Sequence, residues 1–153
     1  MADGQRLERF VAAQDAGGTY DRALAELRAG QKTSHWMWFI FPQIAGLGRS
    51  PTARIYAITS LQEAQDYLQH PVLGPRVLAC AGTVAGIRGR TALQIFGSID
   101  AQKLRSSMTL FQRAAVEGTA PHRDAVPSDV FSAVLERYFD GSPDPETDRL
   151  LDV

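Results

Sequence analysis

The segment 34–43 brings together residue types that can build a site for a flat ligand. It reads Ser-His-Trp-Met-Trp-Phe-Ile-Phe-Pro-Gln and contains both tryptophans of the protein. Trp36 and Trp38 can stack on an aromatic ring, or they can anchor the core. His35 can contact a ligand or act as an acid–base group, or it can be a core histidine bonded to a backbone carbonyl. Gln43 can orient a ligand or satisfy the backbone of the loop that follows it.

Two short segments that contain glycine and arginine each lead into an expected helix start. Residues 46–51 (Gly-Leu-Gly-Arg-Ser-Pro) include Arg49, and Arg54 follows about one helical turn later. Residues 86–91 (Gly-Ile-Arg-Gly-Arg-Thr) have a similar composition. Backbone N–H groups at a helix start and an arginine charge can together bind an anion such as phosphate. Ordinary helix junctions also need glycine and capping residues, so both interpretations stay open.

Three more polar residues are candidates for contacting a ligand. Lys103 lies beside the apolar face of a predicted helix, where its ammonium can enter an enclosed site or stay in water above its packed methylenes. Arg105 can hold a carboxylate or phosphate through two parallel hydrogen bonds, or pair with a surface acid. His70 precedes Pro71 at a helix start and can act as a cap or as an anion contact. His35 and Lys103 are the candidate catalytic residues.

The chain carries no metal or cofactor signature. Its histidines, at positions 35, 70 and 122, lack metal-ligand spacing, and Cys80 is its only cysteine. No Gly-x-Ser-x-Gly elbow, Walker loop or dinucleotide fingerprint occurs. We therefore predict no metal and no cofactor, and we expect Cys80 to be a small buried apolar residue.

Composition and charge narrow the classes of partner. The 153 residues fit one domain spanning 1–153, and 16 basic against 17 acidic side chains leave a net charge of −1. Because the basic residues do not cluster, extended nucleic acid is not an expected partner. No apolar run approaches the roughly 20 residues that cross a bilayer, and residues 1–9 lack the features of a signal peptide. We expect a cytoplasmic protein that does not contact a membrane.

Apolar residues recur at helical spacing along the chain and predict an all-α, helix-dominated domain. A first helix ends at Gly17-Gly18. A second, capped by Thr19 and ended by Gly30, is expected to form an antiparallel pair with the first. Further helix starts are predicted from capping residues and prolines: Ser50-Pro51, Ser60 with Glu63, Pro71, Thr91 with Gln94, Ser128 and Asp144-Pro145.

The longest predicted helix follows Ser98. Its apolar face consists of five residues at helical steps: Ile99, Leu104, Met108, Phe111 and Ala115. Its far side is polar and carries Gln102, Ser106, Thr109 and Arg113. A polar loop over 118–127 is expected after it.

Periodicity alone does not settle the conformation of residues 34–43, because the run is almost uniformly apolar. Ser34 as a cap, Pro42 as a stop and the lack of partner strands favour a short, wholly buried helix over a buried strand.

Four segments in the same order carry a resemblance to a known family: 34–43, 46–54, 67–74 (Tyr-Leu-Gln-His-Pro-Val-Leu-Gly) and 103–111 (Lys-Leu-Arg-Ser-Ser-Met-Thr-Leu-Phe). Over nearly its whole length the chain resembles the DUF1810 family. The resemblance implies an α-helical bacterial protein without an agreed function, and the "calpastatin-like" label sometimes attached to the family has no support in these residues. Residues 70–74 and 105–108 show a fainter similarity to small helical proteins that process ADP-ribose derivatives, from which no catalytic residue is transferred.

Two functional hypotheses follow. In the first, the segment 34–43, the glycine–arginine segments and the Lys103 helix meet at a site for a phosphorylated, nucleotide-like ligand, and hydrolysis of an ADP-ribose derivative is its most specific form. In the second, the domain is a non-catalytic scaffold for an unidentified protein partner. The sequence does not decide whether the protein is an enzyme. The discriminating feature is whether a polar-lined cavity or complete packing surrounds four residues: His35, Trp36, Trp38 and Gln43.

Overall fold

The computed structural model describes residues 2–117 and 129–152, and the regular elements within them are all helical. In chain order these are α1 (Ala2–Asp15), the 3-10 turn η1 (Ala16–Gly18), α2 (Thr19–Ala29), α3 (Met37–Ile40), α4 (Pro51–Ile55), α5 (Leu61–Gln69), α6 (Leu73–Gly86), α7 (Ala92–Phe96), α8 (Ser98–Glu117), α9 (Asp129–Phe139) and α10 (Pro145–Leu151). The predicted all-α class is confirmed. The loop expected over 118–127 and its cap Ser128 lie outside the described residues.

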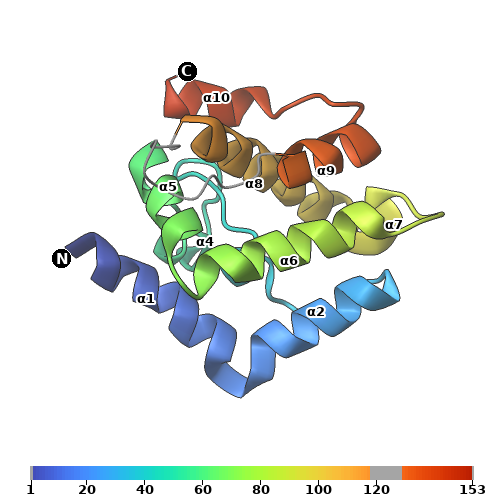
Figure 1. The fold of residues 1–153 in the computed structure, drawn as a ribbon, viewed down its shortest axis with the longest axis horizontal. Coiled ribbons are helices and arrows are strands. Elements are labelled where there is room, and N and C mark those ends of the chain that lie inside the picture. The colour runs from blue at the N-terminus through green and yellow to red at the C-terminus, as the bar shows by residue number, and fades with distance from the viewer. Residues whose placement is uncertain (1, 118–128, 153) are drawn as a thin grey trace.

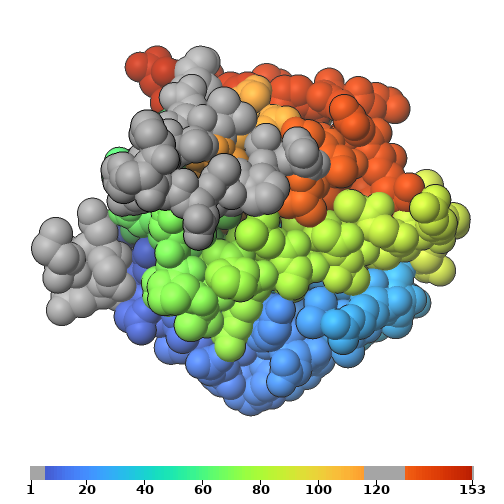
Figure 2. Space-filling model, in the orientation of Figure 1, coloured from blue at the N-terminus to red at the C-terminus, as the bar shows by residue number. Residues whose placement is uncertain are grey.

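The helix α6 crosses the middle of the molecule, with α1 and α2 on one side and α8, α9 and α10 on the other (Figure 1). α8 packs against α5, α7, α9 and α10, whereas α6 packs against α2, α5 and α9. The surface accordingly shows successive bands, from blue N-terminal helices through green α6 to red C-terminal helices (Figure 2). Within the described ranges, no helix is long and apolar enough to cross a membrane.

The buried apolar side chains form one cluster that most of the helices share. Phe111 of α8 contacts Tyr67 of α5 and Phe131 of α9, with ring centroids 5.2 and 5.7 Å apart. The apolar face predicted for α8 is buried with one exception. Ile99 is 73% exposed, because it lies in the first turn of the helix, beyond the packed core. Cys80 is buried in the same cluster, where burial raises the pKa of its thiol to about 12.

The predicted antiparallel pairing of the first two helices is wrong. α1 and α2 diverge from their junction as a V (Figure 1). Gly17 and Gly18 turn the chain there with φ of 61° and 71°, a left-handed conformation that favours glycine. Thr19 is the first helical residue rather than the cap, because its own backbone is already helical. Gly30, with φ of 77°, ends α2 as predicted.

Side-chain caps confirm four of the predicted helix starts. Ser50, Thr91 and Asp144 each accept a hydrogen bond from the backbone N–H three residues further on. The capping box predicted after Thr91 is complete. Ser60 also accepts the amide of Glu63, but the Glu63 carboxylate turns toward the arginines of α1 and leaves that box half formed.

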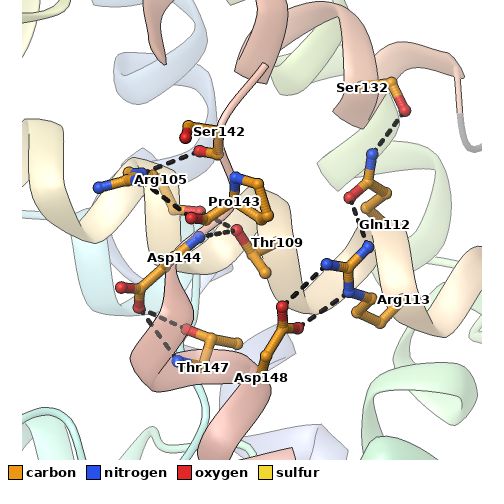
Figure 3. Close-up of polar contacts among 10 residues, drawn as sticks. All are labelled: Arg105, Thr109, Gln112, Arg113, Ser132, Ser142, Pro143, Asp144, Thr147 and Asp148. Carbon is orange, nitrogen blue, oxygen red and sulfur yellow. Dashed lines mark hydrogen bonds and ion pairs between the residues drawn. The ribbon is translucent and has the colours of Figure 1, made fainter. Parts of the chain in front are cut away.

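The side of α8 predicted to be polar and remote is covered by α10. Ser106 and Thr109 are buried there, and Thr109 Oγ1 accepts the backbone N–H of Asp144 at 2.9 Å. Arg113 donates to both carboxylate oxygens of Asp148, each at 2.9 Å (Figure 3). Because α10 satisfies these side chains, they contribute to packing instead of facing water.

Candidate functional site

One carboxylate fixes the conformation of the chain that leads into the aromatic segment. Glu26 of α2 accepts the backbone N–H groups of Thr33 and Ser34, the Ser34 hydroxyl, and the indole N–H of Trp36 at 2.8 Å. Partial burial raises the pKa of Glu26, but these four donors outweigh it and lower the pKa from 4.5 to about 2. Ser34 is therefore held by Glu26 and does not cap a helix.

The aromatic segment is helical, as expected, but α3 is a single turn and is not wholly buried. Trp36 is 1% exposed and belongs to the core. His35 is exposed, and Trp38 is only partly buried. A single turn at 3.6 residues per turn points successive side chains in different directions, so it cannot place all of them in one core. Trp36 and Trp38 consequently have different environments.

A cavity of about 380 Å³ lies between this segment and the first turn of α8. The segment contributes His35, Met37 and Trp38, and the α7–α8 junction contributes Phe96 and Gly97. The remaining lining residues are Lys32, Ser98, Ile99, Asp100 and Lys103. We call this the first cavity. Its volume is within the range of small-molecule sites.

Asp100 lies between two lysines in the first cavity. Its Oδ2 is 2.9 Å from Lys32 Nζ, and its Oδ1 is 3.8 Å from Lys103 Nζ. Lys32 Nζ also donates to the backbone carbonyl of Ser34 at 2.5 Å. Lys103 Nζ donates no hydrogen bond to the residues that the structure describes, so its N–H donors are available to a ligand. Two ammonium groups against one carboxylate leave the cavity with excess positive charge.

Three backbone N–H groups at the start of α8 add to this charge. Gly97 donates its own N–H to the carbonyl of Leu93, and the first bond of the α8 ladder runs from Ala101 to the carbonyl of Gly97. The N–H groups of residues 98–100 therefore have no partner within the described chain, as is usual in a first helical turn. Gly97 has no side chain that could cap them. The positive end of a 20-residue helix thus adjoins the cavity.

Trp38 links the segment to α8. Lys103 Nζ lies 4.9 Å from its ring centroid, so the ammonium covers one indole face. The indole N–H of Trp38 is buried and has no hydrogen-bond partner in the described chain. A small cavity of about 10 Å³, enough for about one water molecule, is lined by Trp38, Gln43 and Lys103 among others.

A second cavity, of about 460 Å³, lies on the other side of Lys103. Its lining includes Gln43, Leu47 and Gly48 from the loop before α4, and Asp144 and Glu146 from the start of α10. α8 contributes Ser98, Ile99, Gln102, Lys103 and Ser106. The first and second cavities share Ser98, Ile99 and Lys103, and they are therefore adjacent.

The DUF1810 family model, whose description is "protein of unknown function", matches residues 4–151. The chain belongs to the DUF1810 family. Its structure is similar to the crystal structure of the conserved hypothetical protein Rv1873 from Mycobacterium tuberculosis, with 48% identity, a TM-score of 0.86 and 96% of each chain covered. None of the curated proteins matches the chain.

The structure brings four of the sequence-derived candidates to these cavities: His35, Trp38, Gln43 and Lys103. Trp36 is not among the lining residues, because its ring is in the core and its N–H is bonded to Glu26. The four remaining candidates do not line any of the three cavities either: Arg49, Arg54, His70 and Arg105.

In two of the DUF1810 motifs, 67–74 and 103–111, a candidate side chain instead bonds to other residues of the protein. Arg105 donates to the backbone carbonyls of Ser142 and Pro143, both at 2.9 Å (Figure 3). His70 Nδ1 accepts the N–H groups of residues 72 and 73, and its Nε2 lies 2.9 Å from a carboxylate oxygen of Glu8. Residues 86–91 and the exposed Arg49 and Arg54 likewise line none of the three cavities, although Gly48 and Ala53, next to these arginines, line the small one.

Four charged lining residues were not among the candidates from the sequence: Lys32, Asp100, Asp144 and Glu146. Lys32 follows a helix-ending glycine, where a lysine usually remains in solvent, yet its side chain is only 7% exposed. Asp144 was attributed to a helix start, which explains a carboxylate without any ligand, and Asp100 was not singled out. The residues that the structure describes contain no group of three or more His, Cys, Asp or Glu arranged to hold a metal ion.

Proposed function

We propose that this protein binds a small phosphorylated, nucleotide-like ligand, with its phosphate in the first cavity. One observation carries the proposal: Lys103 presents an ammonium without a hydrogen-bond partner in the described chain beside the free N–H groups of residues 98–100. Helix N-termini and lysines are common phosphate ligands. Lys32 adds a second positive charge, and the partly exposed Trp38 supplies an aromatic wall.

The exposure pattern favours a ligand site over a scaffold. A scaffold whose aromatic segment only fills the core predicts complete packing of that segment. Here Trp36 is packed, whereas His35, Trp38 and Gln43 line cavities together with Lys103. Polar groups from two DUF1810 motifs therefore meet at one place, as a binding site requires.

Calorimetry with inorganic phosphate, AMP, ribose 5-phosphate and ADP-ribose tests the proposal. We expect binding that weakens with added salt, and an affinity at least about 10-fold lower in Lys103→Met, which keeps the aliphatic stem and removes the charge. The matched control is Arg88→Met, an exposed cation outside the three cavities, which should change the affinity by less than about 2-fold. If none of the four compounds releases heat or raises the Tm of the wild-type protein, the proposal is wrong.

Hydrolysis of an ADP-ribose derivative is the most specific form of the proposal. His35 is then the acid–base group, since its imidazole lines the first cavity and no described residue bonds to it. Chromatography of ADP-ribose derivatives after incubation should show products with the wild-type protein and not with His35→Ala. Binding without any product would reject the reaction and retain the binding site.

A further inference from the structure

The second cavity contains a carboxylate that is only partly used by the protein. Asp144 is 4% exposed, and its Oδ2 accepts three hydrogen bonds. The donors are Ser106 Oγ at 2.8 Å, Thr147 Oγ1 at 2.6 Å and Thr147 N–H at 3.3 Å. Oδ1 accepts no hydrogen bond from the described residues. Figure 3 shows this second oxygen without a partner among the side chains drawn.

Helix capping does not require a free Oδ1. Oδ2 alone caps α10 and binds Ser106, so these contacts fix the position of Asp144 and leave Oδ1 available as an acceptor. Oδ1 is not one of the fully buried side-chain atoms that lack a hydrogen-bond partner in the described chain, so it is accessible to a donor. Asp144 lines the second cavity, and a group in that cavity can supply the donor.

The two cavities differ in the charge that they offer. The first has Lys32, Lys103 and the start of α8, which suit an anion. The second has carboxylates at Asp144 and Glu146, which repel an anion and accept hydrogen bonds. The Gln43 side chain makes no hydrogen bond within the described chain, and its amide can donate or accept there. Lys103 belongs to both linings and marks the boundary between them.

We propose that the second cavity receives a hydroxyl-bearing part of the ligand, which donates to Asp144 Oδ1, while the phosphate of the same molecule binds in the first cavity. This inference rests on the proposed function and narrows its ligand to a phosphorylated polyhydroxy compound, such as a sugar phosphate. Asp144 is a specificity residue, because a carboxylate accepts hydrogen bonds from hydroxyl groups and discriminates against an alkyl chain that has none.

Two probes of equal charge and similar length test this inference on the wild-type protein. Ribose 5-phosphate and pentyl phosphate both carry a phosphate on a five-carbon chain, and only the former has hydroxyl groups. We expect ribose 5-phosphate to bind at least about 10-fold more tightly. Equal affinities, or tighter binding of pentyl phosphate, would overturn the inference. If neither probe bound, the proposed function itself would fail.

The variant Asp144→Asn tests whether Asp144 is responsible for the preference for ribose 5-phosphate over pentyl phosphate. Asparagine keeps the size of the side chain and an oxygen for capping, but it loses the charge. We expect ribose 5-phosphate to bind about 10-fold more weakly and pentyl phosphate to change by less than about 2-fold. Gln43→Leu provides a second variant, since this side chain has no bond in the described chain to lose, and it should likewise weaken the sugar phosphate selectively. Equal weakening of both probes by each variant would contradict the inference.

Discussion

Lys103 Nζ lies over the ring of Trp38, 4.9 Å from its centroid, and this contact joins the aromatic segment to the first turn of α8. A cation–π contact of this kind is worth about 0.5–1 kcal/mol when exposed. The ammonium has no hydrogen bond within the described chain, so the contact orients it and leaves its donors available. Lys103 is thereby placed at the boundary of two cavities with different charge.

Asp100 limits the positive charge of the first cavity. Asp100→Asn changes the balance of its charged side chains from one to two positive charges, so we expect ribose 5-phosphate to bind about 3–10-fold more tightly. Asp21→Asn, which removes an exposed carboxylate outside the three cavities, is the control and should leave the affinity unchanged. Weaker binding by Asp100→Asn would mean that the carboxylate is needed to position the lysines.

Glu26 should make the free energy of unfolding depend on pH under acidic conditions. Its pKa is about 2 in the folded protein, against an ordinary value of 4.5. The unfolded chain therefore takes up the proton first, and the stabilisation present above pH 4.5 is lost as the pH falls toward 2. At neutral pH, Glu26→Gln should lower the free energy of unfolding by about 1–2 kcal/mol.

Urea unfolding of wild type and Glu26→Gln at neutral and acid pH measures this effect. The difference between the two proteins should shrink as the pH falls. Glu136→Gln, an exposed carboxylate of α9, should follow the wild-type pH dependence. A difference that stays constant down to low pH would show that Glu26 acts through packing instead of charge.

Gly74 fits α6 closely against the end of α5. A Cβ at this position would lie 2.2 Å from the backbone carbonyl oxygen of Leu68, which has no freedom to move away. We expect Gly74→Ala to lower the free energy of unfolding by about 3 kcal/mol. Gly82 lies in the same helix, where an added Cβ would meet only Val130 Cγ2 at 3.8 Å. Gly82→Ala should raise stability by up to about 1 kcal/mol, and similar losses in both variants would reject the steric explanation.

Local sequence signals predicted much of the fold. Ser50, Thr91 and Asp144 cap helices where their spacing indicated, and Gly30 ends α2 in the left-handed conformation. These features depend on a few neighbouring residues, so the sequence contains the needed information. The V of α1 and α2 was missed, because the direction in which two helices leave a glycine turn depends on the packing of distant segments.

The candidate site was only partly predictable. The sequence singled out His35, Trp38, Gln43 and Lys103 by type, and the structure gathers them at adjacent cavities. It could not reveal that Glu26 would hold Trp36 in the core, because the contacts of Glu26 lie seven to ten residues away along the chain. Nor could it show that α10 would cover one side of α8 and leave an oxygen of Asp144 facing a cavity, since both follow from tertiary packing.

The central claim is that a phosphate binds at the first turn of α8, and amide NMR during titration with ribose 5-phosphate tests it most directly. The backbone amide signals of residues 98–100 and the indole N–H signal of Trp38 should shift, whereas the indole N–H of Trp36, bonded to Glu26, should stay in place as an internal control. Saturable binding that leaves the signals of 98–100 unchanged, or that shifts signals mainly around residues 86–91, would contradict the account.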